Sequence, residues 1–401
     1  MTILAVNAGS SSLKFSLHPI VQDEVGPPSL TGTIEGLEPG GSPQMRWKHN
    51  AAAQSKQLSP AQPGDDGDPF MRALVGLRVL LTDELNLPPP LAIAHRVVHG
   101  GARFTQSVIV TQDALAELEA LNSLAPLHQP HNLAGMRAFA EAFSGVPQVV
   151  CFDTAFHAAA PALHQRFALP ASLHDQGVRR YGFHGLSYQY IINSLMKYSE
   201  RARGRVLMAH LGNGASLCAA LEGQSVASTM GFSALDGLMM GTRSGALDPG
   251  VLLYLIEQGW DHQRIEKLLY KESGLLGVSG VSADMRTLRA SEAPAAQEAI
   301  QLFTHRVVRE SGAMMACLQG LDVIAFSGGI GEHDAELREQ VCEALQWADV
   351  RIDHKKNREA TGETVMSVHH PDSRIEIWVV PTDEGRVAAR EAAALILGRQ
   401  G

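Results

Sequence analysis

The apolar and polar positions at the start of the chain predict a hairpin. Residues 3–6 form a short apolar run, residues 7–12 (NAGSSS) have turn composition, and residues 13–17 alternate at the period of a half-buried strand. The turn offers backbone N–H groups and hydroxyls, and Lys14 follows one strand step later. These groups suit a phosphate chain bound with a cation. An ordinary serine-rich hairpin has the same pattern and stays an alternative.

Short apolar runs and helical periodicity predict further elements in the first half. Strands are expected at 45–48, 91–99 and 148–152. Helices are expected at 70–85, 113–121 and 131–143. Residues 26–43 and 54–68 are rich in Gly, Pro and polar residues and are interpreted as surface loops.

The second half repeats the opening pattern. Residues 206–217 again consist of a strand, a turn of Gly, Asn and Ser, and a strand, and a shift of 204 positions places Ser12 on Ser216. Because this offset is about half the chain, it predicts an internal duplication with two similar lobes across a cleft. Coincidence between two hairpins is the alternative.

A third glycine-rich turn, at residues 327–332, follows an apolar strand at 323–326 and precedes a helix expected to begin near Asp334. Backbone of this kind approaches a nucleotide closely. The turn matches neither the dinucleotide-binding fingerprint nor a P-loop. A final strand is expected at 375–380 and a closing helix at 386–397.

Composition narrows the classes of function. With 401 residues, 45% of them hydrophobic, the chain is long enough for two domains. The net charge of -9 argues against nucleic acid as a partner. No run of 18 apolar residues occurs, so we expect a cytoplasmic protein with no membrane partner. Four widely spaced cysteines predict buried thiols rather than disulfides or zinc ligands: Cys151, Cys218, Cys317 and Cys342.

Three charged residues lie at predicted strand ends or in a predicted loop. Arg96 and Asp153 come at the ends of apolar strands, a position that faces a cleft in α/β proteins. Arg243 lies in GTRSG, a loop too rich in glycine to be a helix face. Because a guanidinium group binds a carboxylate or phosphoryl group with two hydrogen bonds, both arginines favour an anionic ligand over a role as surface charges.

Eight segments, in order, closely resemble the acetate kinase family. They are NAGSSSLKF, HRVVHGG, FDTAFH, RRYGFHGLS, HLGNGAS, GTRSGALDPG, SGGIGE and PTDEG. The resemblance implies an α/β fold of the duplicated actin-like ATPase (ribonuclease H-like) class, with two lobes around a nucleotide cleft. It implies an N-terminal lobe of residues 1–150 plus 386–401. The C-terminal lobe, on the base side and the dimer side, would be residues 151–385.

The implied reaction is reversible, in-line transfer of the ATP γ-phosphoryl group to acetate, giving acetyl phosphate and ADP. Mg²⁺ would be required, with Mn²⁺ as a substitute, and the enzyme would be a homodimer. The acceptor is a carboxylate, already ionised at pH 7 like an Asp or Glu side chain with a pKa of roughly 4, so it needs no general base. Catalysis should therefore come from positioning and from cations around the phosphoryl group.

Roles follow from the resemblance, position by position. The catalytic group is Asp153, Arg96, Arg243, His184 and His128. His184 would donate a hydrogen bond to the phosphoryl oxygens, with His128 in support. Asp153 would orient the acceptor or hold Mg²⁺ through water. The acetate pocket would comprise Arg96, Val98, Leu127, Phe183 and Ala234. Ala234 replaces the usual Pro, but one methylene discriminates by only roughly 1 to 3 kcal/mol, so acetate remains the first choice.

The resemblance also assigns the nucleotide and the metal. Nucleotide contacts would come from Lys14, Ser10, Ser12, His210, Leu211, Gly212, Asn213, Gly214, Asp284, Met285, Arg286, Gly329, Ile330, Gly331, Glu332 and His333. His333 departs from the family's usual Asn. Asn7 and Glu384 resemble the two metal positions, with oxygen ligands of the kind Mg²⁺ prefers. For Glu384 the alternative is a favourable charge at a helix N-terminus, worth about 0.3 to 1 kcal/mol.

Two other functions stay open on the sequence. One is a propionate or other short-chain acyl kinase. The other, from a different class, is an actin-like or chaperone-like ATPase whose nucleotide cycle drives partner binding. Such an ATPase would have no need for an acceptor site built from Arg96, Arg243, Asp153 and His184.

Overall fold

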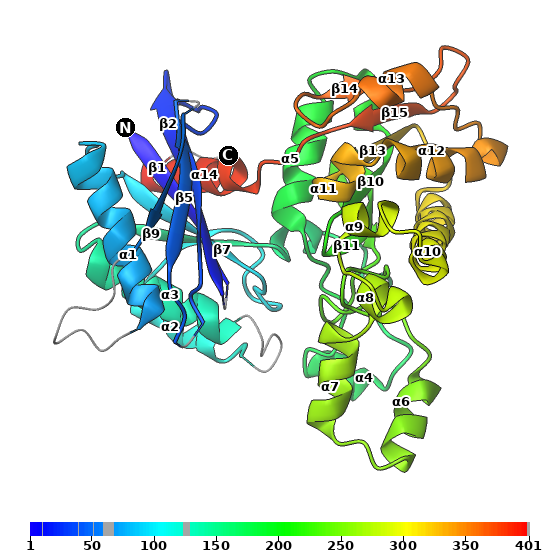
Figure 1. The fold of residues 1–401 in the computed structure, drawn as a ribbon, viewed down its shortest axis with the longest axis horizontal. Coiled ribbons are helices and arrows are strands. Elements are labelled where there is room, and N and C mark those ends of the chain that lie inside the picture. The colour runs from blue at the N-terminus through cyan, green and yellow to red at the C-terminus, as the bar shows by residue number, and fades with distance from the viewer. Residues whose placement is uncertain (10, 39, 51, 59–67, 123–128, 399–401) are drawn as a thin grey trace. The chain divides into compact units, whose positions relative to one another are not determined.

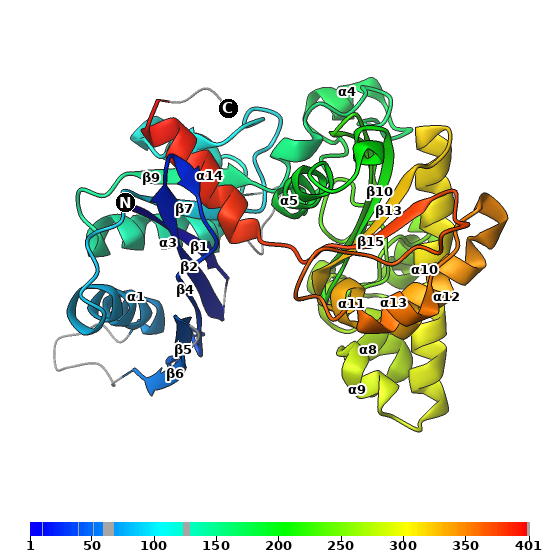
Figure 2. The same cartoon turned by 90° about the horizontal axis from the view of Figure 1, so that it is seen from above.

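The computed structural model describes residues 1–9, 11–38, 40–50, 52–58, 68–122 and 129–398. They form two compact units. Unit 1 is Met1–Ala155 together with the chain from Asp383 onward, and unit 2 is Phe156–Thr382. Each unit is built around its own mixed sheet with helices packed on it (Figures 1 and 2). The predicted α/β class is confirmed.

Unit 1 contains a nine-stranded sheet in the order β6-β5-β4-β2-β1-β7-β9-β8, with β3 paired to β2. The strands are β1 (Thr2–Ala8), β2 (Ser12–Val21), β3 (Glu24–Val25), β4 (Leu30–Glu35), β5 (Gln44–His49), β6 (Ala52–Gln57), β7 (Ala92–Val97), β8 (Val108–Ile109) and β9 (Gln148–Phe152). β1 and β2 form the predicted hairpin, with Asn7 opposite Lys14. Because β1, β7 and β9 are parallel, their carboxyl ends lie at one edge of the sheet.

Helices cover both faces of this sheet. They are α1 (Pro69–Val79) with a π-helical extension (Leu80–Glu84), α2 (Gln112–Glu119), α3 (Gln129–Ala142) and α14 (Glu384–Ile396). Leu74 and Leu77 of α1 and Phe139 of α3 pack with Leu4 and Val6 of β1 in one buried cluster. α14 packs against β1, β7 and β9, so it delivers its first residue, Glu384, near the edge where these strands end.

Two predicted loops contain strands. β4 lies inside residues 26–43. Leu30 and Ile34 of this strand are buried, but the Gly and Pro residues around them give the segment the composition of a loop. β6 runs into residues 54–68, and all six of its residues are exposed. β6 is an edge strand that pairs only with β5, so it carries no apolar pattern from which it could be recognised. The strand predicted at 45–48 is confirmed as β5.

Unit 2 contains a six-stranded sheet in the order β12-β11-β10-β13-β15-β14. The strands are β10 (Arg205–Leu211), β11 (Ala215–Leu221), β12 (Gln224–Ser228), β13 (Val323–Ser327), β14 (Met366–Ser367) and β15 (Glu376–Val379). β10 pairs antiparallel with β11 and parallel with β13. This is the pattern that β1 forms with β2 and β7. The predicted duplication is therefore present in the topology of the two sheets.

Several helices of unit 2 lie beside its sheet, whereas the two helices within residues 249–271 extend away from it (Figure 1). The longer ones are α5 (Gly185–Leu195), α6 (Pro249–Glu257), α7 (His262–Lys271), α10 (Pro294–Leu318) and α12 (Ala335–Ala344). The shorter ones are α4 (Ala171–Asp175), α8 (Gly274–Ser279), α9 (Met285–Arg289), α11 (Gly328–His333) and α13 (His354–Glu359), with 3-10 turns at Ala155–His157, Glu200–Arg203 and Gln346–Ala348. Tyr188 and Ile192 of α5 pack with Met208 of β10 and Ala325 of β13. α10 contacts β10, β11 and β12.

The glycine turn predicted at 327–332 is instead mostly helix α11, and α12 begins at Ala335. Two tertiary contacts explain the helix. The Glu332 carboxylate accepts the backbone N–H of Gly328, and the buried guanidinium of Arg338 donates to the carbonyls of Gly331 and Glu332. Both contacts satisfy backbone groups at the ends of a helix that glycine would otherwise disfavour.

The two units differ by a few residues from the lobes that the resemblance implies. A boundary at 150 would cut β9, which continues to Phe152, and the backbone N–H of Asp153 still donates to the carbonyl of Val97 on the neighbouring strand. At the other end, α14 begins at Glu384 rather than at 386, with Asp383 as its N-cap. Asp153 and Glu384 therefore both belong to unit 1.

All four cysteines are free thiols, and Cys151, Cys218 and Cys342 are buried as predicted. Cys317 is exposed, so that prediction is wrong. It stands on α10, a 25-residue helix whose apolar residues face the sheet while other positions face solvent. In the described part of the chain, no helix has the length and apolarity needed to cross a membrane.

Buried His95 makes unit 1 sensitive to acid. Its Nε2 lies 2.6 Å from Oε1 of Gln148, and burial lowers the pKa of His95 from its ordinary value of 6.5 to about 4. As the pH falls below 6.5, His95 binds a proton in the unfolded chain but stays neutral in the folded chain. The free energy of unfolding therefore decreases between pH 6.5 and 4. The loss amounts to about 3 kcal/mol. Burial also lowers the pKa of His99 to about 4, so it acts in the same direction.

Urea unfolding followed from roughly pH 7.5 to 4.5 checks this. The midpoint is expected to fall with pH in the unmodified chain and to fall less in His95→Gln, whose side-chain amide does not titrate and is long enough to take the position of Nε2 beside Gln148. Equal slopes in the two proteins would contradict the assignment to His95.

Candidate active site

Three charged side chains meet where the parallel strands of unit 1 end. Arg96 lies near the end of β7, Asp153 directly follows β9, and Glu384 begins α14. Nε and Nη2 of Arg96 donate to the two carboxylate oxygens of Asp153, at 3.0 and 2.6 Å. Nε is also 3.3 Å from Oε2 of Glu384. The side chain of Asp153 is 2% exposed and those of Arg96 and Glu384 about a fifth exposed.

The electrostatics of this group favour a further cation. Burial opposes the charge on Arg96, but Asp153 and Glu384 outweigh burial and raise the pKa of Arg96 above its ordinary value. Burial raises the pKa of Glu384, with Arg96 acting against it and Asp153 with it. Two carboxylates thus share one guanidinium in a poorly solvated place. A divalent cation beside Glu384 would stabilise its ionised form, and its oxygens are ligands of the hard type that Mg²⁺ prefers.

The opening hairpin contributes to the same edge. Asn7 is half-buried near the end of β1, and Lys14 lies opposite it on β2 with its side chain exposed. Ser12 is half-buried at the start of β2, and Val98 is half-buried just after β7. Ser10, Leu127 and His128 lie outside the described residues, so their predicted roles stay predictions.

In unit 2, the predicted catalytic residue His184 lies at the start of a helix. It precedes α5 with a φ of 58°, in the left-handed region that non-glycine residues seldom adopt. Its Nδ1 lies 2.9 Å from Oγ of Ser216, and its ring stacks on that of His210 at 4.3 Å. The side chain of the preceding residue, Phe183, is 2% exposed.

Gly214 leaves room beside two side-chain nitrogen atoms. A Cβ atom at Gly214 would stand 3.4 Å from Nε2 of His184 and 3.9 Å from Nη1 of Arg243. The missing side chain therefore keeps open a small space that both nitrogen atoms border. Arg243 is held there because its Nη1 donates to the backbone carbonyl of Ala234 at 2.9 Å. An imidazole and a guanidinium around one open space are suited to an anion.

A pocket of about 970 Å³ lies elsewhere in unit 2, against two of the predicted turns. Its lining includes eight predicted nucleotide residues, Gly212, Asn213, Asp284, Met285, Arg286, Gly329, Ile330 and His333. Nδ1 of His333 is 2.6 Å from the carbonyl oxygen of Thr361, a residue that does not line the pocket. The volume is large enough for a nucleoside.

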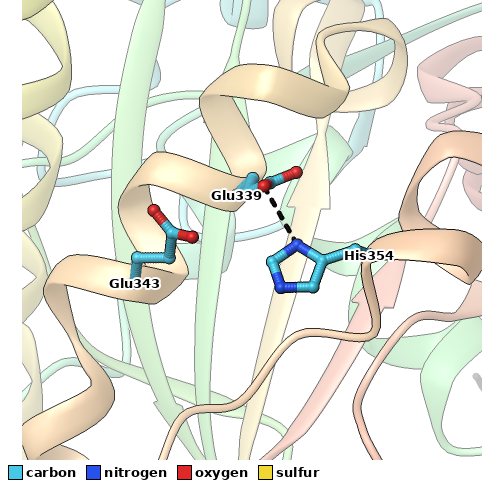
Figure 3. A group of neighbouring side chains, drawn as sticks. All are labelled: Glu339, Glu343 and His354. Atoms are coloured by element: carbon cyan, nitrogen blue, oxygen red, sulfur yellow. Dashed lines mark ion pairs between the residues drawn. The ribbon is translucent and has the colours of Figure 1, made fainter.

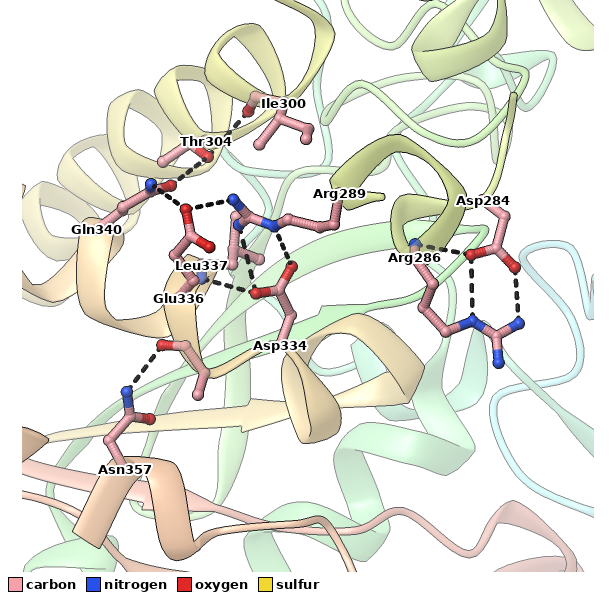
Figure 4. A network of polar contacts seen from close by, with 11 residues as sticks. Asp284, Arg286, Arg289, Ile300, Thr304, Asp334, Glu336, Leu337, Gln340 and Asn357 are labelled. Atoms are coloured by element: carbon pink, nitrogen blue, oxygen red, sulfur yellow. Dashed lines mark hydrogen bonds and ion pairs between the residues drawn. The ribbon is translucent and has the colours of Figure 1, made fainter. Parts of the chain in front are cut away.

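Arg289 also lines this pocket, and the sequence reasoning missed it. Nε of Arg289 is 3.2 Å from Oδ2 of Asp334, and Nη1 is 2.6 Å from Oε1 of Glu336 (Figure 4). Asp334 also accepts the backbone N–H of Leu337 as the N-cap of α12. Arg289 is about 45 residues before its two acidic partners in the chain, so no local sequence pattern indicates these ion pairs.

The family follows from comparison of this chain with known proteins. The model of the acetokinase family matches residues 2–390. The chain belongs to the acetokinase family. An acetate kinase of Rhodopseudomonas palustris is 47% identical over 400 residues, covering 99% of this chain and 98% of that protein.

Solved structures agree with the family. The crystal structure of Porphyromonas gingivalis acetate kinase matches with a TM-score of 0.87 and 34% identity, covering 99% of both chains. A propionate kinase from Francisella tularensis matches with a TM-score of 0.88 and 35% identity, over 97% of this chain and 98% of that one. The match to these structures confirms the two-lobed, duplicated fold predicted from the resemblance.

Some residues assigned by resemblance to the acetokinase family have other surroundings in this structure. Leu211 is fully buried, and Glu332 accepts the backbone N–H groups of Gly328 and Thr382. Neither lines the 970 Å³ pocket, and His210, Gly214 and Gly331 do not line it either. Glu332 thus joins the segment after β13 to the segment that follows β15. The predicted contacts of Leu211, Gly331 and Glu332 with the nucleotide stay predictions.

A separate acidic group lies on the surface of unit 2. Glu339 and Glu343 of α12 and His354 of α13 place ligand-type atoms within 4.8 Å of one another (Figure 3). Nδ1 of His354 is 2.9 Å from Oε1 of Glu339, so this contact joins α12 to α13 as an ion pair when His354 is protonated. None of the three lines the 970 Å³ pocket.

Proposed function

We propose that this chain catalyses the reversible transfer of the γ-phosphoryl group of ATP to acetate. The observation that supports this most is the Arg96, Asp153 and Glu384 group at the edge of the unit 1 sheet, in a chain 47% identical to an acetate kinase. A carboxylate acceptor requires cations and positioned donors, and Arg96 is a half-buried cation held in place by its two hydrogen bonds to Asp153. The partners of the protein are thus two small molecules, acetate and ATP.

The chemistry assigns a role to each group. An acetate oxygen forms a bond to the γ-phosphorus while the bond from that phosphorus to the β–γ bridging oxygen breaks, so ADP leaves with the electron pair. No proton is removed, because acetate is already ionised. Arg243 and Nε2 of His184 border one open space and would stabilise the negative charge of the equatorial oxygens. Arg96 would hold the acceptor carboxylate.

Asp153 and the metal complete the proposal. Asp153 fixes the guanidinium of Arg96 through two hydrogen bonds, so it orients the acceptor rather than removing a proton. Asn7 and Glu384 would hold Mg²⁺, or Mn²⁺ in its place, together with water and phosphate oxygens. The bound ion would neutralise charge on the transferring phosphate chain. ATP would place its base in the pocket lined by Asp284, Met285 and Arg286.

Acetate is favoured over propionate as the acceptor, although a propionate kinase is among the similar structures. Val98 is half-buried and Phe183 is buried, and both are among the apolar residues assigned to the acetate methyl. A comparison of kcat/KM for acetate, propionate and butyrate, with acyl phosphate trapped by hydroxylamine, tests both acceptor and reaction. A higher value for propionate would overturn the choice of acetate. ATP hydrolysis that is independent of acetate and gives no hydroxamate would support an actin-like ATPase instead.

We propose a homodimer in the cytoplasm, with α6 of unit 2 as part of the subunit contact. α6 has no buried residue in the single chain, and Leu253, Tyr254 and Ile256 are each more than half exposed. Apolar residues gathered on one exposed helix are typical of an interaction surface. A second copy of the chain would cover them.

Changing Leu253 and Ile256 together to Asp is expected to give a monomer, because the charges cannot be desolvated in an apolar contact. Light scattering after size-exclusion chromatography measures the mass. Leu163→Asp is the matched control, since Leu163 is a strongly exposed apolar residue of unit 2 outside α6. A dimer that survives the double change would move the contact away from α6.

A further inference from the structure

Two buried hydroxyl groups lie behind the ring of His184. Oγ of Ser216 is 2.9 Å from Nδ1 of His184 and 2.5 Å from the hydroxyl oxygen of Tyr188. Ser216 and Tyr188 are both fully buried. We propose that Tyr188 and Ser216 are positioning residues that hold His184 in the tautomer with its proton on Nε2. The catalytic consequence rests on the proposed function, in which Nε2 donates to the transferring phosphoryl group.

The direction of the two hydrogen bonds follows from counting protons. The Ser216 hydroxyl has one proton, so it donates to only one of its two neighbours. For the phenol proton of Tyr188, the acceptor found among the described residues is Oγ of Ser216. If Ser216 donated to Tyr188, this fully buried proton would lose its acceptor, at a cost of about 1 to 3 kcal/mol. Tyr188 therefore donates to Ser216, and Ser216 donates to Nδ1 of His184.

The surroundings of Tyr188 keep this arrangement in place. Burial raises the pKa of Tyr188 well above its ordinary value, so the phenol keeps the proton that it donates. Its ring packs edge-on against His157 at 5.7 Å and beside Phe156. The phenol therefore has little freedom to turn away from Ser216.

The backbone before His184 is held by another histidine, His157, which is buried. Nε2 of His157 lies 2.9 Å from the carbonyl oxygen of Phe183, and Nδ1 lies 2.8 Å from Oγ of Ser225. Because a carbonyl can only accept, Nε2 of His157 carries a proton and donates it. This contact supports the turn that places His184 at a φ of 58°. His184 is thus fixed both through its backbone and through Nδ1.

The tautomer decides what His184 presents to a ligand. Nε2 is the nitrogen beside the open space at Gly214, which Nη1 of Arg243 also borders. With its proton on Nε2, a neutral His184 presents a donor to that space. The other tautomer would present a lone pair, which would repel a phosphoryl oxygen. Ser216 and Tyr188 thus select the donor form without contacting the substrate.

Nitrogen-15 NMR of the unliganded full chain tests the tautomer directly. Two-bond ¹⁵N–¹H correlations, with the His184 signals assigned by comparison with His184→Gln, show which nitrogen is protonated at neutral pH. We expect the proton on Nε2 in the unmodified chain and a mixture of tautomers in Ser216→Ala. A proton on Nδ1 in the unmodified chain would overturn the proposal.

Kinetics of the same variants test the consequence. Ser216→Ala is expected to lower kcat by about 10- to 100-fold, which is less than the loss of a direct donor, with the KM for acetate unchanged. Tyr188→Phe keeps the Ser216 proton and is expected to lower kcat by less than about tenfold. Ser216→Thr retains the hydroxyl and should recover most of the activity. Ser311→Ala is the matched control, since Ser311 is a buried serine of α10 that donates to the carbonyl of Val307.

The outcomes separate the two proposals. Unchanged kcat in Ser216→Ala would overturn the positioning role, as would a fall in kcat that Ser311→Ala shows equally. If the unmodified chain gives no acyl phosphate, the proposed function fails, whereas the NMR result still decides the tautomer. If Ser216→Ala does not fold, the spectrum of the unmodified chain and the kcat of Tyr188→Phe decide the matter.

Discussion

Arg96→Ala is expected to lower kcat by about 10³-fold and to destabilise the fold by about 3 to 5 kcal/mol. The loss of activity follows from the proposed contact between the guanidinium and the acceptor carboxylate. The loss of stability has a separate cause. Arg96 donates two hydrogen bonds to Asp153, whose side chain is 2% exposed, and it also pairs with Glu384. Removing Arg96 leaves these carboxylates in a poorly solvated place without their cation.

A double variant separates the two effects. In Arg96→Ala with Asp153→Asn the uncompensated negative charge is removed, so the thermal midpoint should recover much of a loss of about 10 °C. Activity should not recover. Arg103→Ala is the matched control, because Arg103 forms an exposed ion pair with Glu117 that is worth at most about 1 kcal/mol. Near-normal turnover of Asp153→Asn alone, with Mg²⁺ in excess, would contradict the assignment of Asp153.

Arg243→Ala is expected to lower kcat by at least about 10³-fold while leaving the fold intact. Arg243 donates to the backbone carbonyl of Ala234 and borders the open space at Gly214. Its role in the proposed function is to stabilise charge that develops during transfer, so kcat should fall more than the KM for acetate rises. Arg243→Lys should recover only part of the rate, since an ammonium group lacks the planar fork of a guanidinium.

The measurement is steady-state kinetics with a hydroxamate or coupled ADP assay. Arg309→Ala is the matched control in unit 2, because Arg309 pairs with its neighbour Glu310 near the surface of α10. An Arg243→Ala variant with at least a tenth of the normal kcat would place Arg243 outside the phosphoryl site.

Much of the architecture was predictable because its signals are local. Apolar runs located β1, β7, β9 and β13, and the repeated strand–turn–strand segment indicated two related sheets. The residues at strand ends were predictable for the same reason, since parallel strands bring Asn7, Arg96 and Asp153 to one edge. Family motifs then supplied roles that no spacing gives.

Other features depended on contacts between distant residues. β6 has no buried side chain and exists through pairing with β5, so its own sequence does not indicate a strand. Helix α11 depends on Arg338 and Glu332, which satisfy its backbone groups, where glycine composition alone favoured a turn. Arg289 lines the pocket, where its ion pairs with Asp334 and Glu336 hold its side chain.

The sequence alone determined the family, the order of the strands' apolar runs and the residue types that the chemistry requires. The tertiary structure decided which hydrogen bonds those residues form and in which direction. The pairing of Arg96 with Asp153 and the chain from Tyr188 through Ser216 to His184 join positions 57, 28 and 32 residues apart. Periodicity encodes which face a residue buries, whereas the direction of a hydrogen bond depends on the partners that folding brings within 3 Å.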